Sequence, residues 1–361
     1  SMSERRWPPS RFAKTADLLA KKWNAKILFF GVASEKNLVD EVISKLDPSM
    51  NTVAINLAGK TSISQIVGVV KRLFLLVTND TATMHIAGAA GTPIVALFLV
   101  HAFGAETGPY CENAVLLEPD ISCFPCLHNS KCPHYECLGY IMPEHALEAS
   151  KIAVALKEGK KADVDPAFFG QSYGMKERKV LVKRTLFDNE GYYDSRPVFK
   201  KVPTQHELLG RVYRHYFKKP ETTGLTLETL RREIAEIYDA MPTREMASFL
   251  VDKIAVFKKL GEAAERGKNA VVKTRKYVKG GSMDAETMAV HVTEIETADY
   301  DLELLSLTHP ELNPFIKLFA VGTGNLSGGP DAMLERKKAL FEELKGSADE
   351  IEGLLAGLKP L

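Results

Sequence analysis

Short apolar runs alternate with amphipathic stretches over the first 160 residues. The apolar runs predict buried strands over residues 26–30, 51–57, 74–77, 94–98 and 113–117. Apolar residues at helical spacing predict helices over residues 10–23, 36–46, 63–70, 81–90 and 143–158. Strands that alternate with helices in this way form doubly wound parallel sheets. The pattern predicts a Rossmann-like α/β domain over residues 1–160.

The pattern changes after residue 160. Residues 161–202 are predicted to be a linker with a candidate β-hairpin, because the turn sequence 188–191 separates two β-prone runs. From residue 203 to 361 the apolar residues recur at helical spacing, ending in a helix over residues 331–358. The last part is therefore expected to be a mainly α-helical domain of unknown role, packed on the first domain or on another subunit.

The segment from residue 75 to 98 carries the strongest chemical signal. It predicts a strand that leads directly into a helix N-terminus, where Asp80 is placed to cap the first free N–H groups. The residues from Thr81 to Thr83 are small enough to let a phosphate reach those N–H groups. His85, one turn later, is expected to face the same anion as Thr81.

Four motifs resemble those of glycosyltransferase family 9, the ADP-heptose:lipopolysaccharide heptosyltransferases. Three of them are Arg5 to Ala13, Gly59 to Ile63 and Asp80 to Ala87. The fourth is the cysteine-rich stretch from Cys123 to Leu138. Together they extend the resemblance over roughly residues 5–158 and leave the rest of the chain unexplained.

The resemblance implies the C-terminal, donor-binding half of a GT-B architecture, which binds an ADP-sugar of the ADP-heptose type. The residues that it places around the donor are Arg5, Glu35, Thr61, Asp80, Thr81, Ala82 and His85. The acceptor would be a lipopolysaccharide or a related glycolipid or glycan. No catalytic residue is assigned, because the family's acceptor domain supplies the base and no segment of this sequence resembles that domain. The region is therefore expected to be inactive alone and to be a glycosyltransferase when an acceptor domain completes it.

The sequence departs from the family pattern at two places. Ala82 and Thr83 stand where Gly and Pro are usual, and Leu99-Val100-His101 replaces a Gly-Pro-Thr sequence. A methyl group at Ala82 adds bulk where backbone should contact phosphate. The alternative hypothesis is a non-catalytic nucleotide-binding or scaffold protein derived from this fold.

Four cysteines lie close together in the sequence, at Cys123, Cys126, Cys132 and Cys137. Such a cluster first suggests a structural metal site, zinc before iron–sulfur, that would pin a loop beside the crevice. Disulfides formed on purification and free thiols are the alternatives. Cys111 lies outside the cluster and is expected to be a free thiol.

Composition excludes some functions and leaves others open. A formal net charge of +1 argues against nucleic-acid binding. No apolar stretch is long enough for a transmembrane segment and no signal peptide is recognisable, so a cytoplasmic location is expected. The basic run over 268–279 is a candidate for peripheral contact with the inner membrane, although a solvated face or loop is the usual explanation. The family also has a strand before Trp7 that this sequence does not provide, so a partner chain or homo-oligomer is expected.

Overall fold

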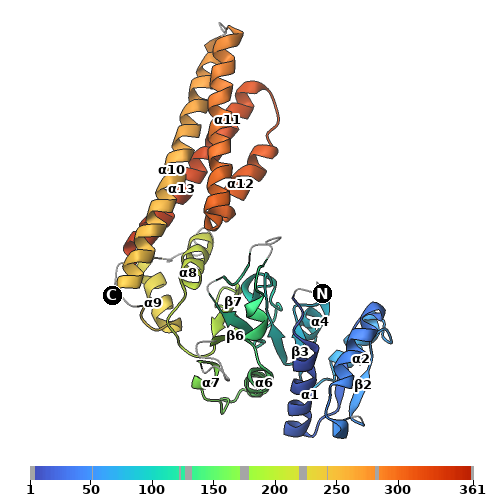
Figure 1. Ribbon diagram of the computed structural model, residues 1–361. Coiled ribbons are helices and arrows are strands. Elements are labelled where there is room, and N and C mark those ends of the chain that lie inside the picture. Colours follow the sequence, from blue (N-terminus) through green and yellow to red (C-terminus); the bar gives the residue numbers. More distant parts are fainter. Residues whose placement is uncertain are drawn as a thin grey trace. The chain divides into compact units, whose positions relative to one another are not determined.

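The protein divides into two compact units, residues 1–200 and residues 201–361. The computed structural model describes residues 5–358 apart from 51, 122, 127–131, 171–178, 219–225, 242 and 281–283. Figure 1 shows the elements of both units in chain order.

The first unit alternates strands and helices as predicted. Its helices are α1 (Pro9–Trp23), α2 (Lys36–Ser44), α3 (Ile63–Val70), α4 (Ala82–Ala90), α5 (Gly104–Thr107), α6 (Pro143–Lys157) and α7 (Ala167–Gly170). Its strands are β1 (Ile27–Phe29), β2 (Ala54–Asn56), β3 (Leu76–Asn79), β4 (Ile94–Leu97), β5 (Val115–Asp120), β6 (Lys179–Phe187) and β7 (Tyr193–Pro197).

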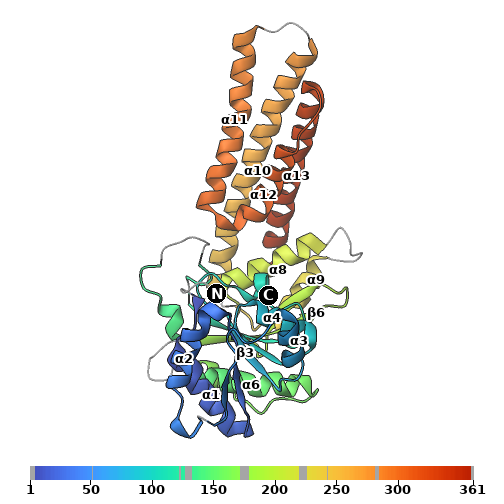
Figure 2. The ribbon, with the colours of Figure 1, turned by 90° about the vertical axis from the view of Figure 1, so that its right-hand side faces the viewer.

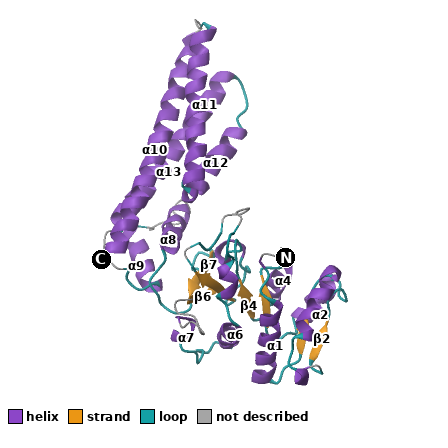
Figure 3. Ribbon diagram, viewed as in Figure 1, coloured by secondary structure: helices purple, strands orange, loops and turns teal. Residues whose placement is uncertain are grey.

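These strands form two sheets (Figure 3). One is five-stranded with the order β3-β4-β5-β6-β7, and the other pairs β1 with β2 alone. The pairs β1–β2, β3–β4 and β4–β5 are parallel, whereas β5–β6 and β6–β7 are antiparallel.

Helices cover both faces of the larger sheet. Successive side chains of a strand point to opposite faces, so each strand contributes to an apolar cluster on either side. Val95 and Leu97 pack in one apolar cluster with Ala149 of α6, while Ile94 and Ala96 pack in another with Met84 of α4. Figure 2 shows α6 and α4 in this unit. The prediction of a doubly wound, Rossmann-like α/β fold is therefore confirmed.

The local signals at two helix ends also act as the sequence predicted. Ser62 and Gln65 form a capping box at the start of α3. Gly91 ends α4 in the left-handed conformation with φ +71°, which glycine adopts without steric penalty. These residues fix where each helix meets its neighbouring loop.

The candidate hairpin forms, with β6 and β7 joined across the turn. The Asp188 carboxylate accepts hydrogen bonds from the N–H groups of Glu190 and Tyr192, and Gly191 takes φ +85°. Because β6 also pairs with β5, this hairpin extends the sheet of the first unit. Part of the predicted linker, residues 171–178, lies outside the described residues.

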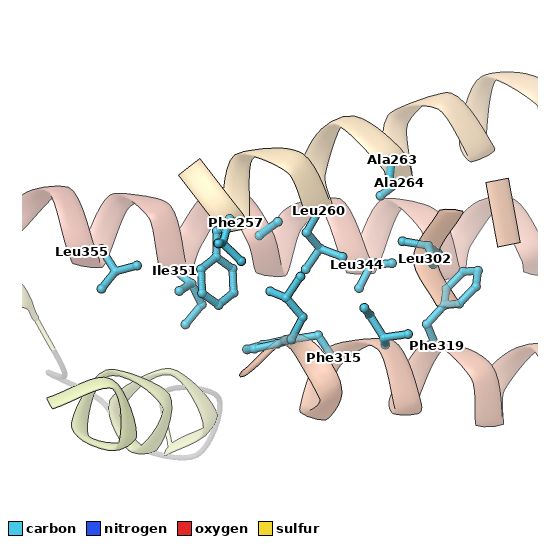
Figure 4. Packing of buried hydrophobic residues seen from close by; sticks show 14 of the residues in the cluster. Phe257, Leu260, Ala263, Ala264, Leu302, Phe315, Phe319, Leu344, Ile351 and Leu355 are labelled. Carbon is cyan, nitrogen blue, oxygen red and sulfur yellow. The ribbon is translucent and has the colours of Figure 1, made fainter. Parts of the chain in front are cut away.

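The second unit is helical, as the spacing of its apolar residues predicted. Its helices are α8 (Gln205–Lys218), α9 (Leu227–Ile237), α10 (Thr243–Gly280), α11 (Ala285–Thr308), α12 (Asn313–Gly324) and α13 (Pro330–Gly357). The core lies between α10 and α13, and α11 and α12 add Leu302, Phe315 and Phe319 to it (Figure 4). Among the described helices, none is both long and apolar enough to cross a bilayer.

The basic run over residues 268–279 lies on α10 rather than in a loop. Arg275 Nε lies 2.6 Å from a carboxylate oxygen of Asp331 on α13, and Lys273 Nζ lies 3.5 Å from Glu294 on α11. At least Arg275 and Lys273 of this run are therefore paired with carboxylates of neighbouring helices.

Two helical glycines in the second unit should respond in opposite ways to alanine. A Cβ at Gly267 would overlap the buried ring of Phe341, whereas a Cβ at Gly346 would meet open space. Gly346→Ala should raise the free energy of unfolding by up to about 1 kcal/mol, because alanine is the better helix former. Gly267→Ala should lower it by about 1–3 kcal/mol through overpacking. Urea denaturation of the two variants measures both effects, and equal shifts would contradict this packing.

The stability of the first unit should depend on the titration of His145. This side chain is 1% exposed, and burial together with the charge of Arg11 lowers its pKa to about 4. Below pH 6.5 the unfolded chain gains a proton that the folded chain does not bind, so stability is complete above pH 6.5 and declines as the pH falls toward 4. At pH 5 the loss from this group should be about 2 kcal/mol.

The variant His145→Gln should remove that loss, because glutamine can still accept the Met142 N–H bond that His145 Nδ1 accepts at 3.0 Å. Unfolding at pH 7 and pH 5 measures the difference. His134→Gln is the matched control, since His134 is exposed. An unchanged pH dependence in His145→Gln would show that this histidine does not titrate as described.

Candidate functional site

The candidate site is centred on Asp80, directly after β3. Its Oδ2 accepts hydrogen bonds from Arg5 Nη1 at 3.0 Å and from Thr107 Oγ1 at 3.2 Å. The prediction that Asp80 caps α4 is wrong: Thr81 is the N-cap residue, and its side chain makes no capping hydrogen bond. The Asp80 carboxylate instead joins three segments that lie far apart in the sequence.

The N-terminus of α4 is open at this point. The Thr81 hydroxyl lies 3.1 Å from the Thr78 hydroxyl, while Ala82 and His85 are exposed. The first N–H groups of a helix carry partial positive charge, so an uncapped and exposed helix start can receive an anion. It lies beside Asp80, where the sequence predicted a phosphate site.

Glu35 follows β1, in a short 3₁₀ turn over Ala33–Glu35. Its carboxylate accepts the Val32 N–H at 3.1 Å and lies 3.7 Å from Arg6 Nη2. Arg5 and Arg6 are consecutive, so this short stretch of chain links the Asp80 side of the site to the Glu35 side.

Thr61 and His85 lie outside this contact network, and the Thr81 hydroxyl contacts Thr78 rather than another candidate. Thr61 is half-buried and directly precedes Ser62, the N-cap residue of α3. In the described part of the chain, no hydrogen bond or ion pair connects Thr61 or His85 to the other candidates. Thr61 lies before the start of α3, and His85 lies in the first turns of α4. Only a ligand that touches both of them would include them in one site with Asp80.

A buried ion pair holds the loop that carries Thr107. Glu118 on β5 and Lys183 on β6 are 0% and 5% exposed, with 2.7 Å between Nζ and Oε2. The other Glu118 oxygen accepts the Gly104 N–H at 3.0 Å, at the start of α5. A side chain at Gly104 would overlap Glu118, so this glycine allows the close approach. The pair thereby fixes α5 and, with it, the hydroxyl that meets Asp80.

Sequence reasoning missed Arg6, Thr107 and this ion pair. Arg6 is adjacent to a predicted site residue, and its neighbour Glu35 was also predicted, so that signal was available. Thr107 and the pair of Glu118 and Lys183 had no motif to mark them, because their partners lie many residues away.

Val100, three residues after the end of β4, has an unusual backbone conformation. Its φ is +61°, which is rare for a β-branched residue, and the residue is 4% exposed. Its carbonyl accepts the Cys126 N–H at 2.9 Å. The cysteine loop therefore contacts the segment that follows β4 directly.

The zinc site predicted at the four cysteines is not supported. Within the described residues, no three His, Cys, Asp or Glu side chains form a group that could hold a metal ion. The thiols engage the local backbone instead: Cys126 Sγ donates to the Cys123 carbonyl at 3.6 Å, and Cys132 Sγ accepts the Tyr135 N–H at 3.2 Å. All four cysteines, and Cys111, are free thiols.

Comparison with known proteins finds similarity over part of the first unit. The model of glycosyltransferase family 9 (heptosyltransferase) matches residues 1–135. This stretch of the chain is thus similar to glycosyltransferase family 9. The resemblance drawn from the four motifs is therefore confirmed for this stretch of the chain.

Heptosyltransferases are among the relatives of the family 9 region. Lipooligosaccharide heptosyltransferase 2 of Campylobacter jejuni is 33% identical over 153 residues, 41% of this chain and 46% of that protein. Lipopolysaccharide heptosyltransferase 2 of Escherichia coli is 32% identical over 94 residues, 26% of this chain and 27% of that protein. The chain thus spans less than half the length of these relatives.

The solved structure of E. coli ADP-heptose LPS heptosyltransferase II is 26% identical, with a TM-score of 0.37. The match covers 43% of this chain and 44% of that one. A family 9 glycosyltransferase from Veillonella parvula gives a TM-score of 0.34.

The five cysteines should differ in their reactivity toward iodoacetamide. Burial raises the pKa of Cys111, Cys126 and Cys137, so at pH 8 these three hold less of the reactive thiolate than an unperturbed thiol. Cys123 is exposed and should be alkylated first, whereas Cys137 is 4% exposed and should react among the last. Timed alkylation followed by peptide mass spectrometry measures the order. Labelling of Cys137 ahead of Cys123 would contradict the described loop.

Proposed function

We propose that the family 9 region binds the nucleotide-sugar donor, an ADP-sugar of the ADP-heptose type, of a glycosyltransferase. The observation that carries this proposal is the Asp80 carboxylate, held by Arg5 and Thr107 beside the open N-terminus of α4. A cation, an oriented carboxylate and free helix N–H groups together suit a diphosphate attached to a sugar.

Each candidate residue has a chemical task in this proposal. The N–H groups at Ala82 and Thr83 and the Arg5 guanidinium would bind the diphosphate, with Thr81 and His85 at its edge. Asp80 would accept hydrogen bonds from the sugar or hold Arg5 in place. Glu35 would accept from the ribose hydroxyls, and Thr61 would flank the nucleoside.

The transfer step requires an acceptor hydroxyl, proposed to be that of a lipopolysaccharide or a related glycan. A carboxylate of the acceptor-binding part would take the hydroxyl proton as the oxygen attacks the anomeric carbon and ADP departs. The helix dipole of α4 and Arg5 would stabilise the charge that builds up on the diphosphate. We assign no residue of the described chain as the base, and we place the reaction in the cytoplasm, at the inner membrane where a glycolipid acceptor resides.

One observation favours the alternative of a non-catalytic scaffold. Arg5 and Asp80 form an ion pair with each other, so the cation proposed for the phosphate is already neutralised within the chain. To bind a phosphate, Arg5 would have to give up part of its contact with Asp80. The methyl group of Ala82 would also leave less room for the phosphate at the N-terminus of α4. Nucleotide affinity distinguishes the two functions.

Thermal unfolding with ADP, UDP, GDP and CMP tests the proposal. ADP at about 100 times its dissociation constant should add about 2.7 kcal/mol to the stability of the protein, and the other nucleotides should add less. Asp80→Ala should lose most of the ADP shift, because Arg5 is no longer oriented. Asp163→Ala is the matched control, since Asp163 is an exposed carboxylate elsewhere in the first unit.

A selective ADP shift that disappears in Asp80→Ala and persists in Asp163→Ala is the expected result. The absence of a shift with every nucleotide would refute donor binding and favour the scaffold.

A further inference from the structure

Helix α11 of the second unit has apolar side chains on two opposite faces. On one face Ile295, Ala298 and Leu302 are buried in the core of the unit. On the opposite face apolar side chains and threonines follow one another at alternating spacings of three and four residues, which is the spacing of the a and d positions of a coiled coil. We call this face the outer stripe; its residues are Val290, Thr293, Thr297, Tyr300, Leu304 and Leu307.

The outer stripe is exposed along its whole length. Its apolar side chains are 55% (Val290), 63% (Tyr300), 48% (Leu304) and 73% (Leu307) exposed. A helix that is apolar on all sides is normally buried on all sides, and contiguous exposed apolar surface typically marks an interaction site. The outer stripe therefore has the composition of a buried seam and the exposure of a free surface.

The two threonines of the stripe are compatible with burial. The Thr293 hydroxyl donates to the Ala289 carbonyl at 2.9 Å, and the Thr297 hydroxyl donates to the Thr293 carbonyl at 2.7 Å. Because both hydroxyls form their hydrogen bonds within α11, a partner that covers them leaves neither hydroxyl donor unpaired. These polar residues thus do not interrupt the surface that a partner could cover.

A groove between α10 and α11 borders the stripe (Figure 2). The charged groups along this groove are paired within the chain. Lys273 Nζ lies 3.5 Å from a carboxylate oxygen of Glu294, and Arg266 Nη2 lies 2.9 Å from one of Asp301. On this side of the stripe a partner would meet charges that already compensate each other.

The other flank of the stripe carries acidic charge. Glu296 and Glu303 directly precede Thr297 and Leu304 and are exposed, and within the described residues neither takes part in an ion pair. In a coiled coil the residues that flank the seam of one helix meet those of the other helix and decide which partners pair. A second copy of α11 would bring carboxylates against carboxylates, and an anionic lipid surface would be repelled as well. A basic helix complements this flank.

We propose that the outer stripe of α11 binds an amphipathic helix of a partner protein, with Leu, Ile or Val along its seam and Lys or Arg beside it. The basic side chains would pair with Glu296 and Glu303, and the opposite flank of the partner would lie along the groove beside α10. From Val290 to Leu307 the stripe is about 26 Å long, so the partner helix would need about 18 residues. The proposal concerns the second unit and does not depend on nucleotide binding.

Fluorescence anisotropy of a labelled peptide, titrated with the full chain, tests the proposal. The probe consists of three repeats of Lys-Leu-Ala-Gln-Leu-Lys-Gln, which places Leu along the seam and Lys on both flanks. The control peptide has Glu in place of every Lys. The Lys peptide should bind at least about tenfold more tightly than the Glu peptide, because like charges across an interface are strongly unfavourable.

Two double variants locate the binding surface. Leu304→Gln with Leu307→Gln should weaken binding of the Lys peptide at least about tenfold, because the stripe loses two of its apolar contacts. Leu318→Gln with Val321→Gln is the matched control, since both residues are exposed apolar side chains of α12, and it should leave the affinity unchanged. Far-UV circular dichroism of both variants checks that the helices are retained.

A charge exchange tests the acidic flank. Glu296→Lys with Glu303→Lys should reverse the preference, so that the Glu peptide binds more tightly than the Lys peptide. Equal binding of the two peptides to the unmodified chain, no binding of the Lys peptide, or an unchanged preference in this variant would overturn the proposal.

Two further measurements distinguish other occupants of the stripe. A dimer in sedimentation velocity that dissociates in the Leu304→Gln, Leu307→Gln variant would show that a second copy covers this surface. Co-sedimentation with phosphatidylcholine vesicles that is lost in the same variant would show that a membrane does. Either result would replace the partner helix and so overturn the proposal.

Discussion

A parallel sheet has to be covered on both faces and paired along its strands, and this constraint organises the first unit. The fully buried strands β4 and β5 meet it, with α6 on one side and α4 on the other. The antiparallel hairpin of β6 and β7 pairs with the outer edge of β5 and so satisfies the constraint there. Within the described residues, β1 and β3 are each paired along one side only. The candidate site lies at the carboxyl ends of these two strands, where parallel α/β folds bind ligands.

The candidate site depends on charged groups that are satisfied within the protein. Asp80 has two donors, and the loop that brings one of them rests on a pair of charges with almost no solvent exposure. Removal of one member of such a pair leaves an uncompensated charge and typically costs about 3–5 kcal/mol. The buried pair of Glu118 and Lys183 therefore helps to position Asp80, although neither residue would touch a ligand.

Local signals in the sequence predicted much of this architecture. The capping box at Ser62, the left-handed Gly91 and the turn at 188–191 each act within a few residues, so the sequence pattern was sufficient to place them. The motifs around Arg5 and Asp80 predicted residues that the fold brings into contact although 75 positions separate them.

What the sequence could not predict depends on contacts between distant segments. Asp80 was expected to cap α4. Instead Arg5 and Thr107 both donate to one oxygen of its carboxylate and orient that side chain. The hairpin was expected within a linker, and its pairing with β5 made it part of the sheet. The spacing of the four cysteines suggested a metal, yet within the described residues no group of side chains could hold one, and the sulfur atoms of Cys126 and Cys132 form hydrogen bonds with nearby backbone groups.

The carbonyl of Val100 links the cysteine loop to the backbone that follows β4. It belongs to the segment that follows β4, and it is also the acceptor for the Cys126 N–H. A buried valine with positive φ holds strain of the order of 1–3 kcal/mol, which persists only while its surroundings enforce it. The thiol-bearing loop is one of those surroundings, because its Cys126 N–H donates to the Val100 carbonyl, so the conformation of this loop and the backbone that follows β4 depend on each other.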